Sequence, residues 1–395
     1  MDYTYNIHAI YSEKIGKIKC INKLFIKKKK GMIYLHYYET ESGFTEDRKN
    51  NYEEPWTSYT EDIDRVDYND PYLKKPFTIK ALGTGSVSWS LGEKNVLYSK
   101  NNGVWETMTS ATTVPVSNGD EIHFKGENSN YSANTISSTT QFNIEGNIMS
   151  LIDADGFKSA NIISSDDAFA KFFYNNTNLI SAENLKLPAK KLTGIRCYYE
   201  MFRGCTGLVK GPELPAMELS DYCYSGIFNG CESLLVAPEL PAMNLSQCCY
   251  SSAFTNCFSL QKAPDLPVEK LTNSCYKYMF DGCSGLTEVM ETLPATTLTQ
   301  YCYQYMFRFC SNITTAPVLP ATSLFNGCYS YMFTGCSKLN YIKAMFTTKP
   351  TTTYTWGWVN NVASAGTFVK NSNATWSVSG GNGIPSGWTV QTATP

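Results

Sequence analysis

Residues 293–320 read LPATTLTQYCYQYMFRFCSNITTAPVLP, and this pattern recurs through the second half of the chain. Its frame is L-P-A-x-x-L-x-x-x-C-Y-x-x-M-F-x-G-C-x-x-L-x-x-A-P-x, after which Leu-Pro returns. The prolines of the six Leu-Pro pairs, spaced by 27, 26, 26, 27 and 26 residues, are Pro188, Pro215, Pro241, Pro267, Pro294 and Pro320. A fixed period of this length predicts a solenoid, in which each unit contacts only its neighbours.

A single repeat is too small to fold alone. It supplies about five large apolar side chains, whose burial contributes roughly 10 kcal/mol in total. Ordering the backbone of about 26 residues costs on the order of 1–2 kcal/mol per residue. The units above and below must therefore cover the Leu, Phe and Cys side chains of each repeat.

Each repeat predicts a short helix followed by a short strand. Cys275, Met279 and Cys283 are four residues apart and would share one helical face. Gly282 lies where a helix commonly ends in a left-handed residue. Within the following strand a proline removes one backbone donor in four repeats, which predicts a broken or very short sheet. These prolines are Pro212, Pro238, Pro264 and Pro317.

The stretch M-F-x-G-C-x-x-L-x-x-A-P-x-L-P, over about residues 169–340, resembles the Treponema-type leucine-rich repeat of BspA-like surface proteins. It also resembles the longer C-Y-x-x-M-F variant found in gut Bacteroidales and their crAss-like phages. The ending from Trp358 to Val390 resembles the terminal cap of those proteins. The resemblance implies adhesion or binding and brings no catalytic residues. BspA-like proteins are secreted, whereas no export signal is recognisable in this sequence.

The expected fold class is an α/β solenoid of leucine-rich-repeat-like, 26-residue repeats with an N-terminal β-sandwich and β caps. Residues 1–75 form a charged segment, first basic and then acidic, expected to anchor or assemble the protein. Residues 76–155 contain alternating runs typical of a β-sandwich that caps the solenoid of residues 156–340. Residues 341–395 are expected to form the C-terminal β cap, using Trp356, Trp358, Trp376 and Trp388.

Twelve of the fourteen cysteines follow the repeat. Each has equivalents in the neighbouring repeats, so no unique disulfide pairing is specified, and no C-x-x-C suggests zinc. Small buried apolar thiols explain the pattern best. The twelve are Cys197, Cys223, Cys249, Cys275, Cys302 and Cys328, then Cys205, Cys231, Cys257, Cys283, Cys310 and Cys336.

The sequence offers little for chemistry. The histidines are His8, His36 and His123, each in a different local context, and no nucleophile elbow, Walker loop or zinc motif appears. Paired carboxylates of a glycosidase are not excluded by sequence. The prediction is a non-enzymatic protein without cofactor or metal. The net charge of −2 gives no field for specific nucleic-acid binding, and no apolar run is long enough to span a membrane.

Two sets of side chains are candidates for ligand binding. Tyr278, Tyr305 and Tyr331 lie three residues after the first repeat cysteine and should form a surface ladder suited to sugar rings. The alternative is that they are ordinary solvent-facing tyrosines. Glu213, Glu239 and Asp265 precede successive Leu-Pro pairs and should form an acidic stripe. That stripe would engage a cationic partner or only solvate the surface.

The leading functional hypothesis is a virion protein of a phage, a head or tail fibre or a decoration. Its solenoid would bind a host-surface glycan or protein, and residues 1–75 would contact other virion proteins; a homo-oligomer is left open. The repeat type, the charged N-terminal segment and the absence of a recognised export signal motivate it. The alternatives are a BspA-like adhesin on the bacterial outer surface and an assembly protein without a receptor.

Overall fold

The computed structural model describes residues 70–132 and 134–393, together with the backbone of five strands within residues 3–39. The chain divides into two units, Met1–Ile63 and Asp64–Pro395. In the first unit β1 (Tyr3–Tyr5), β4 (Ile21–Lys29) and β5 (Met32–Glu39) form one antiparallel sheet, and β2 (Ile10–Ser12) pairs with β3 (Lys17–Lys19). The other residues of the predicted anchor, up to residue 69, lie outside the described part.

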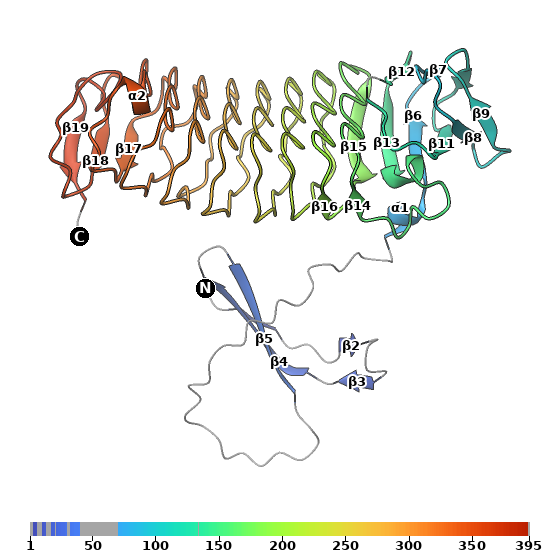
Figure 1. Cartoon of the computed structure of the whole chain (residues 1–395), viewed down its shortest axis with the longest axis horizontal. Coiled ribbons are helices and arrows are strands. Elements are labelled where there is room, and N and C mark those ends of the chain that lie inside the picture. Colours follow the sequence, from blue (N-terminus) through green and yellow to red (C-terminus); the bar gives the residue numbers. More distant parts are fainter. Residues whose placement is uncertain are drawn as a thin grey trace. The chain divides into compact units, whose positions relative to one another are not determined.

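The second unit begins with two packed β-sheets (Figure 1). One has the strand order β15-β13-β6-β11-β8-β9 and the other β10-β7-β12. Phe77 and Phe124 of the larger sheet contact Trp89 of the smaller one, with ring centroids 6.5 and 5.2 Å apart. The strands are β6 (Phe77–Ala81), β7 (Gly85–Trp89), β8 (Val96–Lys100), β9 (Glu106–Met108), β10 (Thr113–Val116), β11 (Glu121–Gly126), β12 (Ile136–Ser138), β13 (Phe142–Asn147) and β15 (Leu179–Lys186).

The alternating runs at residues 77–81 and 121–125 are therefore confirmed as strands. Before the sheets, α1 (Pro71–Lys74) is capped by the carboxylate of Asp70, which accepts from the Tyr72 N–H. The 3₁₀ helix η1 (Ile148–Leu151) follows β13. Because β13 pairs in parallel with β15, the larger sheet continues directly into the first repeat.

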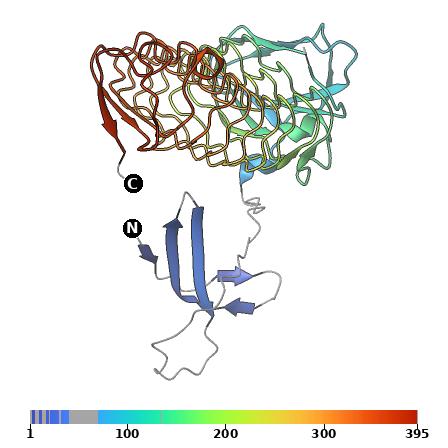
Figure 2. The ribbon, with the colours of Figure 1, turned by 60° about the vertical axis from the view of Figure 1, so that its left-hand side comes forward.

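Beyond β15 the repeats stack one behind another (Figure 2). The helix expected in each repeat is wrong: the C-Y-x-x-M-F segments are chains of turns. Left-handed residues recur at every fourth position, with φ of 56° at Ser274, 58° at Tyr278 and 77° at Gly282. Such residues interrupt an α-helix, in which consecutive residues must all be right-handed.

The backbone N–H groups of these turns alternate between two kinds of acceptor. The N–H groups of Tyr276, Tyr278 and Phe280 donate to carbonyls of the next repeat at 2.9–3.1 Å. Those of Lys277 and Met279, between them, close turns onto the residue three positions back at 3.2 Å. The segment is therefore hydrogen-bonded without a helix, and half of its bonds join it to its neighbour.

The opposite side of each repeat is extended but forms almost no sheet. The two-residue strands β14 (Ile162–Ile163) and β16 (Lys191–Leu192) pair at the start. Afterwards only isolated bridges join the repeats, such as Lys210 to Val236 and Thr292 to Val318. This confirms the broken sheet expected from the prolines, each of which removes one backbone donor.

Identical side chains stack in columns through the core. The rings of one column are 5.3–5.9 Å apart and those of the other 5.6–6.0 Å, nearly parallel in both. All are buried. The first column is Phe173, Phe202, Phe228, Phe254, Phe280, Phe307 and Phe333; the second is Tyr198, Tyr224, Tyr250, Tyr276, Tyr303 and Tyr329.

The second cysteine of each repeat lies beside the Phe column and is hydrogen-bonded. Its thiol donates to the carbonyl of the Phe one repeat earlier, as Cys283 does to Phe254 at 2.9 Å and Cys310 to Phe280 at 3.0 Å. All thirteen cysteines that the structure describes are free, and twelve of them are buried. The prediction of small buried thiols is confirmed, and the thiol also satisfies a carbonyl inside the stack.

Three parallel strands close the C-terminal end: β17 (Tyr341–Ala344), β18 (Thr367–Lys370) and β19 (Thr389–Thr392). The helix α2 (Thr352–Thr355) lies between the first two. Trp358, Trp376 and Trp388 are buried there as expected. Trp356 is not, because 56% of it is exposed and its ring instead lies 5.8 Å from that of Tyr331.

The burial of the thiols predicts their reactivity. In the native full-length protein, a thiol reagent such as DTNB should leave the twelve repeat cysteines unmodified, while the half-buried Cys248 reacts. After denaturation all of them should react without a reductant. Rapid native labelling of Cys283 or Cys310, read by peptide mass spectrometry, would contradict the packing described above.

Candidate binding surface

Tyr278, Tyr305 and Tyr331 form the ladder that their spacing predicts. The ring centroids of the first pair are 4.4 Å apart with planes within 3°, and those of the second pair are 4.8 Å apart within 4°. All three side chains are half-buried. Trp356 continues the ladder at its C-terminal end, tilted by 36° to Tyr331. The sequence places the three tyrosines by their period, but Trp356 lies one position off that period.

The stacking decides which parts of the tyrosines are available. Each inner ring face contacts the next ring, so a ligand reaches the edges and hydroxyl groups of the ladder, not the faces between its rings. The faces at the two ends of the ladder are different. One belongs to Trp356 and the other to Tyr278, on the side away from Tyr305.

An ion pair supports the side of the ladder. The guanidinium of Arg308 donates two hydrogen bonds to the carboxylate of Asp281, at 2.8 and 2.6 Å, and Asp281 is buried. This pairing raises the pKa of Arg308. The Arg308 carbon Cζ is 4.7 Å from the Tyr305 ring and 5.5 Å from that of Tyr278. A group so close to both stacked rings lies beside the stack, at the edges of the rings.

A second aromatic and charged cluster lies near the N-terminal end of the repeats. Lys171 and Arg203 both approach the Tyr174 ring, at 5.6 and 5.7 Å, and both pair with the carboxylate of Glu200. Sequence reasoning missed this cluster because Lys171 and Tyr174 come from the first, imperfect unit of the repeats. The only available signal was the concentration of Tyr, Lys and Arg at residues 171–203.

The residues of the acidic stripe, Glu213, Glu239 and Asp265, are all exposed. Other carboxylates of the repeats pair with lysines of the neighbouring repeat, as Glu218 does with Lys191 at 2.6 Å and Glu183 with Lys210 at 2.8 Å. The stripe makes no such ion pair with the lysines and arginines of the described residues. It therefore presents negative charge that has no ion-pair partner among the described residues.

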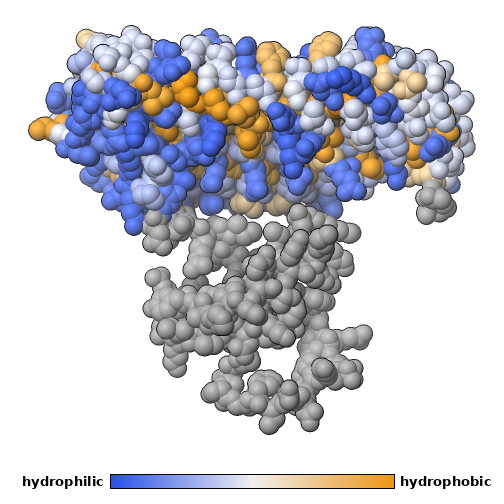
Figure 3. Space-filling view, turned by 180° about the vertical axis from the view of Figure 1, so that it is seen from behind, coloured by the Kyte–Doolittle hydropathy of each residue, from blue (hydrophilic) through white to orange (hydrophobic). Residues whose placement is uncertain are grey.

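The repeats also expose apolar side chains. Leu235 and Val236 are exposed by 48% and 66% and adjoin the half-buried Val209, whose carbonyl accepts the Leu235 N–H at 3.1 Å. Figure 3 shows hydrophobic residues gathered in a band on one face of the repeats. Such a band suits contact with another protein better than contact with a sugar, because it has few polar groups to orient a ligand.

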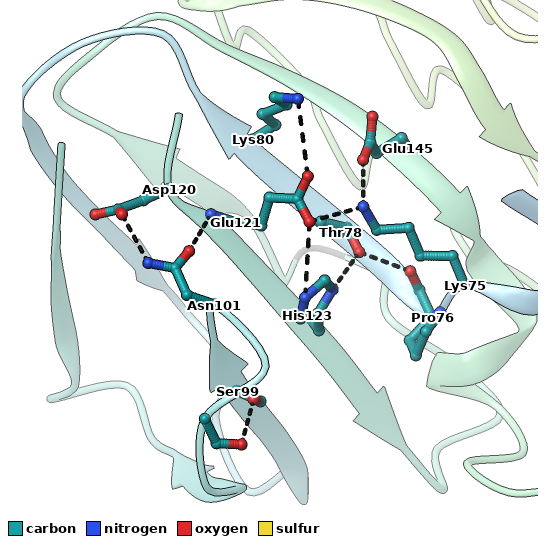
Figure 4. Close-up of polar contacts among 11 residues, drawn as sticks. Lys75, Pro76, Thr78, Lys80, Ser99, Asn101, Asp120, Glu121, His123 and Glu145 are labelled. Atoms are coloured by element: carbon teal, nitrogen blue, oxygen red, sulfur yellow. Dashed lines mark hydrogen bonds and ion pairs between the residues drawn. The ribbon is translucent and has the colours of Figure 1, made fainter. Parts of the chain in front are cut away.

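A polar network on the larger sheet resembles a catalytic constellation (Figure 4). Lys75 pairs with Glu121 at 2.8 Å and Glu145 at 2.5 Å. Although burial opposes it, this pairing raises the pKa of Lys75. The Thr78 hydroxyl lies 2.8 Å from Nδ1 of His123. The arrangement could in principle activate a hydroxyl nucleophile.

The burial and the hydrogen bonds of Thr78 argue against catalysis at its hydroxyl group. Thr78 is completely buried, and its single hydroxyl hydrogen is donated to the Pro76 carbonyl at 2.8 Å. His123 must therefore donate from Nδ1 to Thr78, and its neutral Nε2 has no hydrogen-bond partner. Within residues 70–132 and 134–393, no group of three or more His, Cys, Asp or Glu side chains is arranged to hold a metal ion.

Comparisons with known proteins add nothing to these observations. No protein-family model matches the sequence, and neither a curated protein nor a solved structure gives a match. In the described part of the chain no helix is long and apolar enough to cross a membrane. The structure thus defines the chain as a β-rich protein of several sheets and stacked repeats with few helices.

The environment of His123 predicts a dependence of stability on pH. Burial, aided by the charge of Lys75, lowers the pKa of His123 from the usual 6.5. The unfolded state then binds the proton more readily than the folded state. The contribution of His123 to the free energy of unfolding is therefore fully present above about pH 6.5 and is lost below it, by at most about 1.4 kcal/mol per pH unit. Urea denaturation of the full chain from pH 7.5 to 5 measures this slope.

The matched variant is His123→Gln, which removes the titrating group. Its midpoint should change less than that of the natural chain between pH 6.5 and 5. Burial raises the pKa of Glu121, but the pairing with Lys75 outweighs it and lowers that pKa. Glu121 therefore affects stability only below about pH 4.5, outside the range in which His123 titrates. Equal slopes for both proteins above pH 5 would show that His123 does not carry the effect.

Proposed function

We propose that this protein is a non-enzymatic attachment protein that binds a host-surface glycan or protein through its stacked repeats. In this proposal the stack is a leucine-rich-repeat-like solenoid of the BspA-like type, carried on a phage virion. The observation that supports binding most directly is the half-buried tyrosine ladder with Arg308 fixed beside it. Aromatic rings, hydroxyl groups and a cation on one rigid surface are suited to recognising polar ligands.

Rigidity supports the same proposal. Backbone hydrogen bonds join each repeat to the next, and two buried aromatic columns run through the stack. A surface built on such a core loses little conformational freedom when a ligand binds, so more of the contact energy appears as affinity. A rigid presenting surface is what an attachment protein needs.

The buried thiols argue against a cysteine nucleophile in the repeats. Burial raises the pKa of Cys205 and of Cys283 to about 12, so both remain protonated at neutral pH. A catalytic cysteine needs an accessible thiolate. Their hydrogen bonds to Phe carbonyls give these residues a structural role instead.

The ladder and the acidic stripe are distinguished by matched variants of the full chain. Tyr305→Ser separates the two remaining tyrosines and should weaken binding to the best ligand on a glycan array about tenfold or more. Glu239→Gln alters the middle of the stripe and should leave that binding unchanged. Loss of binding in Glu239→Gln alone would indicate that the ligand binds at the acidic stripe and not at the ladder.

The virion part of the proposal requires a separate experiment. An antibody against residues 76–395 should follow the protein through a density gradient of lysate from the source culture. Co-sedimentation with DNA-filled particles at a fixed copy number is the expected result. Recovery only with the outer membrane would favour the bacterial surface adhesin instead.

A further inference from the structure

The tyrosine ladder stops abruptly at its N-terminal end. The position that Tyr278, Tyr305 and Tyr331 hold in their repeats is held one repeat earlier by Ser252 and two repeats earlier by Gly226. The backbone is the same throughout, with φ between 57° and 63° at these five residues. Only the side chain changes, so the ladder ends because the next ring is missing.

The face of Tyr278 toward Ser252 is consequently not covered by another ring of the ladder. Tyr305 covers the opposite face at 4.4 Å, and within the described residues no aromatic ring stacks on the Ser252 side. Ser252 itself is only half-buried. One further step of 4.4–4.8 Å, the spacing of the existing rungs, would be filled by a single ring.

Glu200 lies on the far side of the interruption. A Cβ atom on Gly226 would lie 3.0 Å from Cγ of Glu200, so the Glu200 side chain packs against the Gly226 position. Glu200 is itself buried and pairs with Lys171 and Arg203. Between Tyr278 and Glu200 the interruption spans two positions, those of Ser252 and Gly226, and the position next to Tyr278 is that of Ser252.

A cation that has no counterion among the described residues lies beside the Tyr278 ring. The Lys277 ammonium is 5.3 Å from the centre of the Tyr278 ring and equally far from that of Tyr301. Among the described residues it has no carboxylate within ion-pair distance, whereas Arg308 is paired with Asp281. Burial lowers the pKa of Lys277, as expected for an ammonium group that lacks an anion.

We propose that an acidic pyranose, such as a uronic acid residue of a glycan, stacks on the open face of Tyr278 at the position of Ser252 and pairs its carboxylate with Lys277. This rests on the proposed glycan-binding function. The C–H face of a pyranose is apolar and packs against an aromatic ring. A carboxylate next to an ammonium in a partly buried site adds a charge-assisted hydrogen bond.

Ser252→Tyr tests the stacking. The backbone at Ser252 already has the conformation of Tyr278, with φ of 57° and 58°, so a tyrosine there should fold and extend the ladder. The new ring would occupy the proposed site. Isothermal titration of the full-length variant with tetragalacturonate should show at least a tenfold loss of affinity, with a melting temperature no lower than that of the natural chain.

Lys277→Gln tests the charge. It should lower the affinity for tetragalacturonate to that for its neutral methyl ester while leaving the affinity for the ester unchanged. The control is Lys262→Gln, an exposed lysine elsewhere in the repeats, which should alter neither. Unchanged tetragalacturonate binding in Ser252→Tyr, or equal affinity of the natural chain for both probes, would overturn the inference.

The two proposals fail in different ways. If the natural chain binds other glycans on an array but not tetragalacturonate, the acidic-sugar site is wrong and glycan attachment stands. If it binds no glycan at all, both are wrong for sugars, and attachment would rest on a protein receptor.

Discussion

The structure depends on the alternation of backbone N–H groups between acceptors in their own repeat and acceptors in the next one. In each turn segment one N–H closes a local turn and the next donates to the following repeat. A left-handed residue at every fourth position makes this alternation possible by rotating successive peptide groups in different directions. About half of the hydrogen bonds of a turn segment are therefore local and half are made to the neighbouring repeat, so the repeats are expected to fold cooperatively.

This backbone also explains why side chains form columns. Because equivalent residues follow one another at nearly constant spacing, any aromatic residue that recurs is placed in contact with its equivalent. The buried Phe and Tyr columns and the half-buried ladder from Tyr278 to Tyr331 arise in the same way. Substitutions of exposed side chains can thus create a binding surface on the stack without changing its backbone.

The period of the repeats, the burial of Phe280 and Cys283 and the interrupted sheet could all be predicted from the sequence. The turn segment could not, because an α-helix and a chain of four-residue turns both bury Cys275, Met279 and Cys283. The difference lies in the backbone angle at Tyr278, where a non-glycine residue adopts a left-handed conformation that propensities disfavour. The spacing of the tyrosines predicted the ladder. That the rings cover one another's faces could be seen only in the structure, where the first two ring centroids are 4.4 Å apart.

The conformation of the ladder residues has an energetic cost. A left-handed tyrosine costs on the order of 1–2 kcal/mol relative to glycine, and glycine holds the same position at Gly226 and Gly357. Each stacked pair of rings contributes about 0.5–1.5 kcal/mol beyond the burial of its area, and three rings form two pairs. Stacking alone therefore does not offset three left-handed tyrosines. Non-glycine residues adopt the left-handed conformation throughout the turn segments, as Tyr222, Tyr301 and Phe309 do. The cost therefore belongs to the stacked turns as a whole, and the area that each side chain buries against its neighbours has to offset it.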